Sequence, residues 1–167
     1  MDKMTHPTRR DFLLRSTLLG AGLALFGRKA LATLTPHHAP RTTGAPIPMA
    51  VYSDPNCGCC SKWVTLMDGA GFTTSVQHTT DMAAIKKRYG IPANLASCHT
   101  AVVGGYKVEG HVPADLIKKM LTEKPKIAGL AVPGMVTGSP GMEGPNPQRY
   151  DVVSFDAAGK TTVYARR

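Results

Sequence analysis

Aromatic and acidic side chains are scarce in this sequence of 167 residues. Only 6% of the residues are Phe, Trp or Tyr, and there are 11 Asp and Glu against 20 Lys and Arg, giving a formal net charge of +9. The basic residues lie mostly near helical patterns and are not interleaved with aromatic residues, as a nucleic-acid surface would require. We therefore expect no nucleic-acid partner and assign the basic residues to solvated helix faces.

The sequence also lacks a long apolar run near its start. The apolar segment 16–26 is shorter than the roughly 20 residues that a membrane-spanning helix needs. It follows the twin-arginine pair Arg9-Arg10 and precedes Ala30-Leu31-Ala32, which has the small-x-small form of a cleavage site. A membrane anchor is the alternative. These signals predict that residues 1–32 are a twin-arginine signal peptide and that the mature protein is periplasmic, with no membrane association after cleavage.

Residues 33–48 are rich in proline and small polar residues, and we interpret them as a flexible linker. Their histidine pair, His37-His38, could bind metal, but nothing in the sequence fixes its geometry. The folded domain is expected to span residues 49–167. The roughly 135 residues that follow the signal peptide can form one hydrophobic core without disulfide support, so the four cysteines are free for chemistry.

Three of the four cysteines lie together, at Cys57, Cys59 and Cys60. An apolar run at 49–52 precedes them, and the spacing of Cys60 with the apolar residues after it is helical. The pattern therefore predicts a strand, a loop and a helix that begins at the cysteines. The positive end of a helix dipole favours thiolate over thiol, and a thiolate is both a nucleophile and a ligand for soft metals.

A structural disulfide is the alternative interpretation of this motif. A bridge between the neighbours Cys59 and Cys60 would be strained. At most one pair forms comfortably within the motif, as Cys57 with Cys60, which leaves Cys59 to find another role.

Strand and helix patterns alternate through the rest of the domain. We expect the further elements to be strand 72–78, a helix from Asp81 to Gly90, strands 100–103 and 106–109 joined by Gly104-Gly105, and a helix after Pro113. The order β-α-β-α-β-β-α over residues 49–124 resembles an α/β, thioredoxin-like domain. Residues 125–149 are predicted to be a Gly/Pro/Met loop, and residues 150–165 an added β-hairpin that could extend one edge of the sheet. In the second helix, Lys86, Lys87 and Arg88 are expected to point largely outward.

The segment before the third strand also bears on metal binding. Glutaredoxin-like proteins carry a cis-proline there, whereas this chain has Cys98 and His99 between Ser97 and Thr100. A proline would exclude metal, but a thiol and an imidazole would add ligands beside the cysteine motif. We expect Cys98 to lie close enough to that motif to share a metal or a disulfide with it. The loop after the hairpin adds His111, which could equally be a polar surface residue.

Four motifs in order carry a closer resemblance, to the CopG-like family of periplasmic copper-resistance proteins. They are Cys57-Gly58-Cys59-Cys60, Ser97-Cys98-His99-Thr100, Glu109-Gly110-His111-Val112-Pro113-Ala114, and Val132-Pro133-Gly134-Met135 with Gly138-Ser139-Pro140-Gly141-Met142-Glu143. The resemblance implies a thioredoxin-like fold, copper binding through the cysteines, and oxidoreductase activity toward copper or disulfides. The candidate ligands are Cys57, Cys59, Cys60, Cys98, His99, His111, Met135 and Met142.

The expected function is copper resistance, with Cu(I) held on cysteine thiolates and a link to thiol redox chemistry left open. Copper ions and other periplasmic copper-resistance proteins are the expected partners. A metal-independent thiol-disulfide oxidoreductase is the enzyme alternative, with Cys57 and Cys60 as its catalytic pair. A passive copper buffer is a third possibility. Zinc is less favoured than copper because adjacent cysteines accompany His and Met. Both Met135 and Met142 could instead fill gaps over the core.

Overall fold

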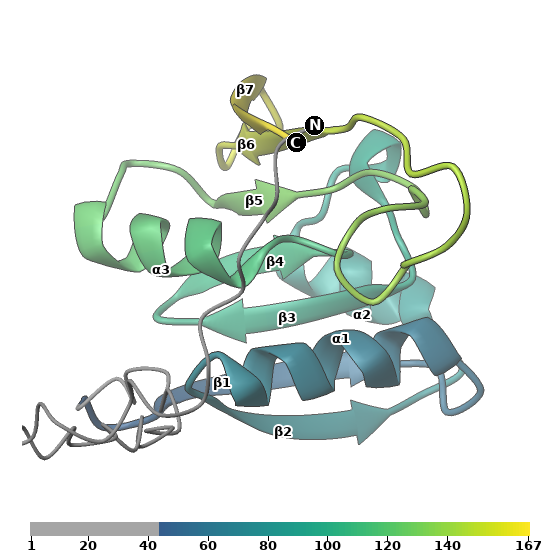
Figure 1. Cartoon of the computed structure of the whole chain (residues 1–167). Coiled ribbons are helices and arrows are strands. Elements are labelled where there is room, and N and C mark those ends of the chain that lie inside the picture. Colours follow the sequence, from purple (N-terminus) through teal and green to yellow (C-terminus); the bar gives the residue numbers. More distant parts are fainter. Residues whose placement is uncertain (1–43) are drawn as a thin grey trace, which may run out of the picture. The chain divides into compact units, whose positions relative to one another are not determined.

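A seven-stranded sheet runs through residues 44–167, the part of the chain that the computed structural model describes (Figure 1). The order across the sheet is β2-β1-β3-β4-β5-β6-β7. The strands are β1 (Ile47–Ser53), β2 (Phe72–His78), β3 (His99–Val103), β4 (Tyr106–Glu109), β5 (Gly129–Ala131), β6 (Asp151–Phe155) and β7 (Thr161–Arg166). The predicted signal peptide and most of the predicted linker, including His37-His38, lie outside the described residues.

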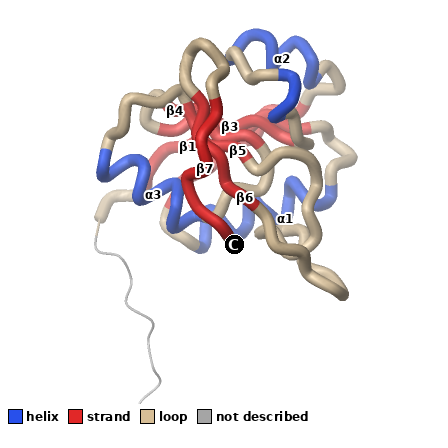
Figure 2. Tube along the Cα trace, turned by 90° about the horizontal axis from the view of Figure 1, so that it is seen from above, coloured by secondary structure: helices blue, strands red, loops and turns tan. Residues whose placement is uncertain are grey.

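Helices cover both faces of the sheet. Helices α1 (Gly58–Gly69) and α3 (Ala114–Glu123) lie on one face, and α2 (Met82–Tyr89) lies on the other (Figure 2). The predicted ends of α2 are present, because the Asp81 side chain accepts a hydrogen bond from the Ala84 amide at 2.9 Å and Gly90 is left-handed with φ 66°. A short 3-10 turn, η1 (Ala93–Leu95), leads from α2 toward β3.

Strand direction determines which loops meet. Strand β1 runs parallel to β2 and antiparallel to β3, with Ser53 opposite His99. Strands β3 and β4 form the predicted two-residue hairpin, with Thr100 opposite Glu109 at its open end. One end of the sheet therefore brings together the end of β1, the start of β3 and the end of β4. The thioredoxin-like α/β prediction is confirmed, and its topology brings all three cysteine- and histidine-bearing loops together.

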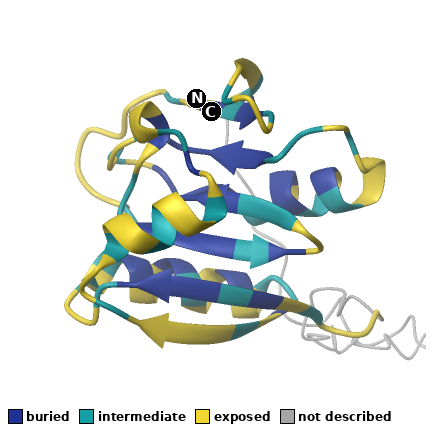
Figure 3. Ribbon diagram, turned by 180° about the vertical axis from the view of Figure 1, so that it is seen from behind, coloured by how far each residue is buried: buried dark blue, intermediate teal, exposed yellow. Residues whose placement is uncertain are grey.

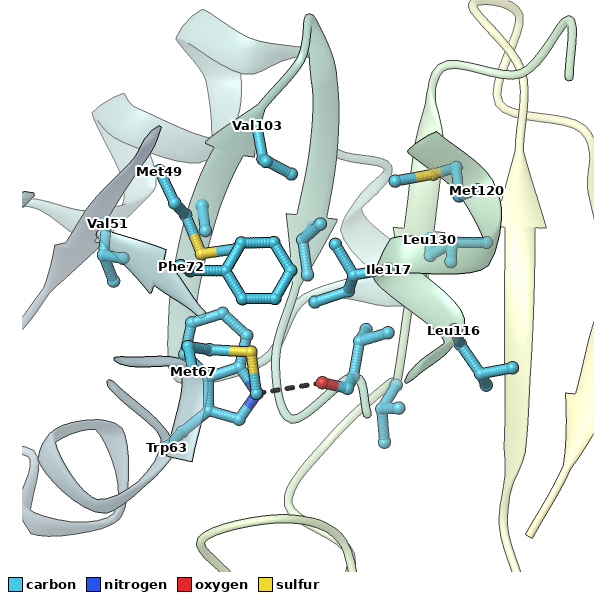
Figure 4. Packing of buried hydrophobic residues seen from close by; sticks show 14 of the residues in the cluster. Met49, Val51, Trp63, Met67, Phe72, Val103, Leu116, Ile117, Met120 and Leu130 are labelled. Atoms are coloured by element: carbon cyan, nitrogen blue, oxygen red, sulfur yellow. Dashed lines mark hydrogen bonds between the residues drawn. The ribbon is translucent and has the colours of Figure 1, made fainter. Parts of the chain in front are cut away.

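The main core lies between the sheet and helices α1 and α3 (Figure 4). Trp63 and Met67 of α1 pack there with Ile117 and Met120 of α3, all of them buried. The indole Nε1 of Trp63 donates a hydrogen bond to the Val112 carbonyl at 3.0 Å, drawn as the dashed line in Figure 4. This bond ties α1 to the loop that precedes α3, which also carries His111.

Exposure differs between the edge and the centre of the sheet. Strands β1 and β3 are largely buried, whereas β2 is mostly exposed (Figure 3). Beyond β4, the sheet continues through β5 into the β6–β7 hairpin, so the predicted hairpin does extend the sheet.

Two expectations about local structure were wrong. Residues 129–131 form β5 instead of loop, because they pair with both β4 and β6 although three residues carry no strand pattern of their own. Gly129 is required there, since an added Cβ would lie 2.0 Å from the Lys107 carbonyl oxygen. Lys86 does not point into solvent: its side chain is only 14% exposed and pairs with the buried carboxylate of Glu109.

Candidate metal centre

The start of α1 positions the three clustered cysteines, as the sequence predicts. Cys57 is the N-cap residue, and Cys59 and Cys60 lie in the first turn. The preceding loop is held by Asp54, whose carbonyl accepts a hydrogen bond from the Cys57 amide at 3.1 Å and whose carboxylate accepts one from the Asn56 amide at 2.8 Å. These local bonds fix the start of α1. They place the sulfur atoms at the end of the sheet where β1 and β4 finish and β3 begins.

Cys57 and Cys60 are joined by a disulfide, whereas Cys59 and Cys98 are free. The Sγ of Cys59 lies 3.5 Å from that of Cys57 and 3.9 Å from that of Cys98. All four sulfur atoms lie within 4.8 Å of one another. The expected proximity of Cys98 to the motif is confirmed. In this oxidised form the site offers two thiols, and opening the disulfide would supply two more.

A second group of ligand atoms shares Cys98. Its Sγ lies 3.3 Å from Nδ1 of His99 and 3.0 Å from Nε2 of His111. Both histidines are fully buried, so His111 belongs to the site and not to the surface. The other ring nitrogen of His111, Nδ1, contacts the Pro140 carbonyl oxygen at 2.7 Å. Because a carbonyl only accepts, Nδ1 carries the proton and Nε2 directs a lone pair at Cys98.

Burial controls the protonation of this group. It raises the pKa of the Cys98 thiol to about 12, with the neighbouring Cys59 adding to the rise. Burial lowers the pKa of His99 to about 3, helped by repulsion from His111 when that ring is protonated and by the charge of Lys86, and burial also lowers the pKa of His111. At neutral pH the metal-free site therefore holds a Cys98 thiol and two neutral imidazoles. A metal that binds Cys98 must displace its proton.

A buried ion pair lies directly behind the ligand loops. Glu109 is completely buried, and its Oε1 accepts hydrogen bonds from Lys86 Nζ at 2.5 Å and from the Ser97 amide at 2.7 Å. Its Oε2 accepts one from the Thr100 hydroxyl at 2.6 Å. Burial raises the pKa of Glu109, and Lys86 opposes that rise.

The position of this ion pair in the chain gives it a role in the site. Ser97 and Thr100 flank Cys98 and His99, and Glu109 stands two residues before His111. One carboxylate thus fixes both loops that carry these ligands. No function was expected for Glu109 or Lys86 from the sequence. A glutamate at the end of a buried strand, next to a histidine motif, was the available signal.

The tail loop packs against the same loops. Gly141 has φ +82°, and an added Cβ would lie 2.9 Å from the Trp63 amide nitrogen and 3.0 Å from the Cys59 carbonyl oxygen. At the other end of the tail loop, the Gly134 amide donates to the Ala96 carbonyl at 3.3 Å, and the Ser97 hydroxyl donates to the Gly134 carbonyl. The tail is therefore an ordered part of the site.

The two candidate methionines follow these tail contacts directly. Met135 comes after Gly134 and is 57% exposed, whereas Met142 comes after Gly141 and is half-buried. Their backbones are held beside the two cysteine loops. Met135 does not fill a gap in the core, because more than half of its surface is open to solvent.

Comparison with known proteins places this geometry in a family. A family model described as "Protein of unknown function, DUF411" matches residues 95–142. A search of curated proteins gave no match. Two solved structures titled "Copper resistance protein copG", forms 1 and 2, are each 42% identical, with TM-scores of 0.69, and the match covers 73% of this chain and 98% of theirs. The chain belongs to the CopG family of copper resistance proteins. The part of this CopG-family chain that the DUF411 model matches includes Cys98, His99, His111 and both tail methionines.

The donor set of this CopG-family site suits a soft metal. It combines thiol sulfur with imidazole nitrogen, a combination that copper and zinc both accept, and carboxylates are absent from the ligand groups found in residues 44–167. Across those same residues, no helix has the length and apolarity needed to cross a membrane.

Proposed function

We propose that this protein acts in copper resistance by binding Cu(I) on the thiolates of Cys57, Cys59, Cys60 and Cys98. The observation that carries the proposal is the convergence of four sulfur atoms, from the start of α1 and the loop before β3, within 4.8 Å of one another. Membership of the CopG family supports copper as the metal in preference to zinc. Cu(I) accepts two or three soft ligands, so four thiolates could hold more than one ion.

The disulfide gives this proposal a redox component. With Cys57–Cys60 closed, two of the four sulfur atoms are unable to act as thiolates. Reduction by an external dithiol would proceed by exchange through a mixed disulfide, consume two electrons and two protons, and restore all four ligands. Reduction would then load copper. The reverse exchange with a partner disulfide, which takes up the two electrons and two protons, would close Cys57–Cys60 again and release copper. Met135 and Met142, beside the two cysteine loops, are proposed as additional thioether ligands during this transfer.

A Cu(I) titration of the reduced and disulfide forms tests the proposal. Protein handled without oxygen should show four titratable thiols when reduced and bind Cu(I) in competition with a chromogenic chelator. Cys98→Ser should lower the copper stoichiometry or affinity while leaving the far-ultraviolet circular dichroism unchanged. If reduced protein does not compete for Cu(I), or if Cys98→Ser binds it like the parent, the shared thiolate site is wrong.

A metal-independent thiol-disulfide oxidoreductase is the second candidate, favoured by the position of the Cys57–Cys60 disulfide at a helix N-terminus. In that case metal-free protein should catalyse disulfide reduction, and copper should inhibit by occupying the thiolates. The copper proposal expects the metal-free protein to be nearly inert in the same assay.

The cellular location belongs to the same proposal. We place the mature protein in the periplasm, with residues 1–32 removed after twin-arginine export. The linker would end at residue 46, because Ile47 and Pro48, which the sequence assigned to a linker at 33–48, belong to strand β1 and therefore to the domain expected at 49–167. Other periplasmic copper-resistance proteins are the proposed exchange partners.

A further inference from the structure

Strand β2 is one edge of the sheet, and no other strand of residues 44–167 pairs with its outer side (Figure 3). Its seven residues, Phe72–His78, include no Lys, Arg, Asp, Glu or Pro, and its register with β1 is uninterrupted. Proteins usually protect edge strands with charges, prolines or bulges, because unpaired backbone groups there recruit other strands. Strand β2 has none of these protections within its own sequence.

The opposite edge of the sheet is different. Strand β7 ends at Arg166, and Arg167 follows it. Its pairing with β6 contains a register shift between Val152 and Val153. Terminal charge and an irregular register both oppose the addition of another strand. Of the two edges, β2 is therefore the one suited to pairing with another chain.

The hydrogen bonds between β1 and β2 show which backbone groups of β2 face outward. The Thr79 amide donates to the Ser53 carbonyl at 3.0 Å, so Thr79 faces β1. The backbone groups of successive residues alternate in direction along a strand. The amide and carbonyl groups of Thr74, Val76 and His78 therefore point away from β1, toward the open edge.

One of these outward amides already has a partner. The Thr74 amide donates to the Asp68 carboxylate of α1 at 3.1 Å, and the Thr74 hydroxyl donates to the same oxygen at 2.8 Å. This cap blocks the first half of the edge. The segment beyond it, Val76–His78, is exposed throughout, and Val76 is one of four large apolar side chains that are exposed in the described part of the chain.

We propose that the β2 edge pairs antiparallel with the β2 edge of a second copy of this chain, which gives a two-fold symmetric dimer with one continuous sheet. Gln77 lies on the two-fold axis, and Val76 lies opposite His78 of the second copy. Both symmetry-related Val76–His78 pairs then exchange their two backbone hydrogen bonds. This register leaves the cap between Asp68 and Thr74 intact.

A second copy suits this edge better than the chain's own linker does. The predicted linker contains Pro36, Pro40 and Pro46, and proline has no amide hydrogen to donate to a neighbouring strand. Two copies of β2 place no Lys, Arg, Asp or Glu opposite one another, so the pairing is self-complementary. Because the two strands run antiparallel, the candidate metal centres of the two copies point in opposite directions. Dimer formation therefore requires no metal and does not depend on the proposed copper function.

Analytical ultracentrifugation of the full-length protein tests for the dimer. A thiol reductant and a chelator are present, so that neither disulfides nor metal ions link the copies. The mean mass of the parent should rise from monomer toward dimer as the concentration increases, because so short an interface binds weakly. Val76→Lys adds a charge to the edge and should stay monomeric at every concentration. Val163→Lys, at an exposed residue of β7, is the matched control and should dimerise like the parent.

Gln77→Cys tests the register of the pairing. Residues opposite one another in a non-hydrogen-bonded antiparallel pair have Cα atoms about 4.5 Å apart, within reach of a disulfide. Mild oxidation should therefore link two copies through the thiols introduced at position 77, as peptide mass spectrometry would show. Ser75→Cys is the matched control, because Ser75 is also exposed and lies on the same face of β2. In this register its copy is about 13 Å away along the strand, too far for a disulfide.

The outcomes decide the proposal whatever the metal does. A parent that stays monomeric at all concentrations, or a Val76→Lys variant that dimerises like the parent, would overturn it. Equal cross-linking of Gln77→Cys and Ser75→Cys would also overturn it, since random collisions link both positions. Links through the native Cys59 or Cys98 form equally in the parent and are identified there. Should Val76→Lys fail to fold, the two cysteine variants decide alone.

Discussion

The Nδ1 of His111 donates a hydrogen bond to the carbonyl oxygen of Pro140, 29 residues further along the chain, at 2.7 Å. This bond joins the loop before α3 to the tail loop and sets the tautomer of a candidate ligand. The next residue, Gly141, packs against the backbone of Cys59 and Trp63 in the first two turns of α1. The tail therefore braces both the cysteine helix and the histidine, and its removal should affect the site as well as stability.

Gly141→Ala should destabilise the protein and weaken copper binding. The added Cβ would contact Trp63 and Cys59 backbone atoms at 2.9–3.0 Å, in a left-handed conformation that costs an alanine about 1–2 kcal/mol before any clash. We expect a loss of about 2 kcal/mol or more in the free energy of unfolding, measured with urea. Gly69→Ala is the matched control, because its Cβ meets no atom within 4 Å. Equal stability of the two variants would show that the tail does not pack on α1 in solution.

Glu109→Ala should cost about 3–5 kcal/mol of stability, because it leaves the largely buried Lys86 without a counter-charge and the Ser97 amide without its acceptor. Adding Lys86→Met should recover part of this loss. Thermal and urea unfolding of the two single variants and the double variant measure the coupling. As a control, Glu123→Gln removes an exposed partner 3.9 Å from Lys119 and should change stability by less than about 0.5 kcal/mol. The ion pair has no positioning role if folded Glu109→Gln binds Cu(I) like the parent.

Acid should destabilise the metal-free protein through His99. In the unfolded chain this histidine takes up a proton near pH 6.5, whereas burial lowers its folded pKa to about 3. Its contribution to stability is therefore complete above pH 6.5 and is lost as the pH falls toward 3, by on the order of 3 kcal/mol at pH 4. Urea midpoints between pH 7 and pH 4 should fall less steeply for His99→Phe than for the parent. If the urea midpoints of the parent and of His99→Phe fall equally between pH 7 and pH 4, His99 is not buried in its neutral form.

Replacing both arginines of the export signal, as Arg9→Lys/Arg10→Lys, should leave uncleaved precursor in the cytoplasm, because twin-arginine export depends on this pair. Cell fractionation and N-terminal sequencing of the periplasmic form measure the effect. Arg15→Lys is a charge-matched control and should be exported normally, with a mature terminus near Thr33. Normal export of the double variant would remove the twin-arginine assignment.

The sequence by itself determined the elements whose signals are local. Asp81 and Gly90 marked the ends of α2, and Gly104-Gly105 marked a two-residue hairpin, because capping and left-handed turns are decided by a few adjacent residues. The cysteine motif at the start of α1 was predicted in the same way. Once the element order indicated a thioredoxin-like sheet, the proximity of Cys98 to that motif followed from topology.

Only the tertiary structure decided what depends on partners distant in sequence. Strand β5 forms because β4 and β6 supply its hydrogen bonds, and no sequence pattern within Gly129–Ala131 predicts a strand. Lys86 lies on a helix face that periodicity marks as polar, yet a buried carboxylate 23 residues away draws it inward. His111 is a ligand candidate of fixed tautomer because the fold buries it and brings the Pro140 carbonyl to its ring. These features depend on strand pairing and on burial by segments that are distant in sequence, and a local sequence pattern predicts neither of them.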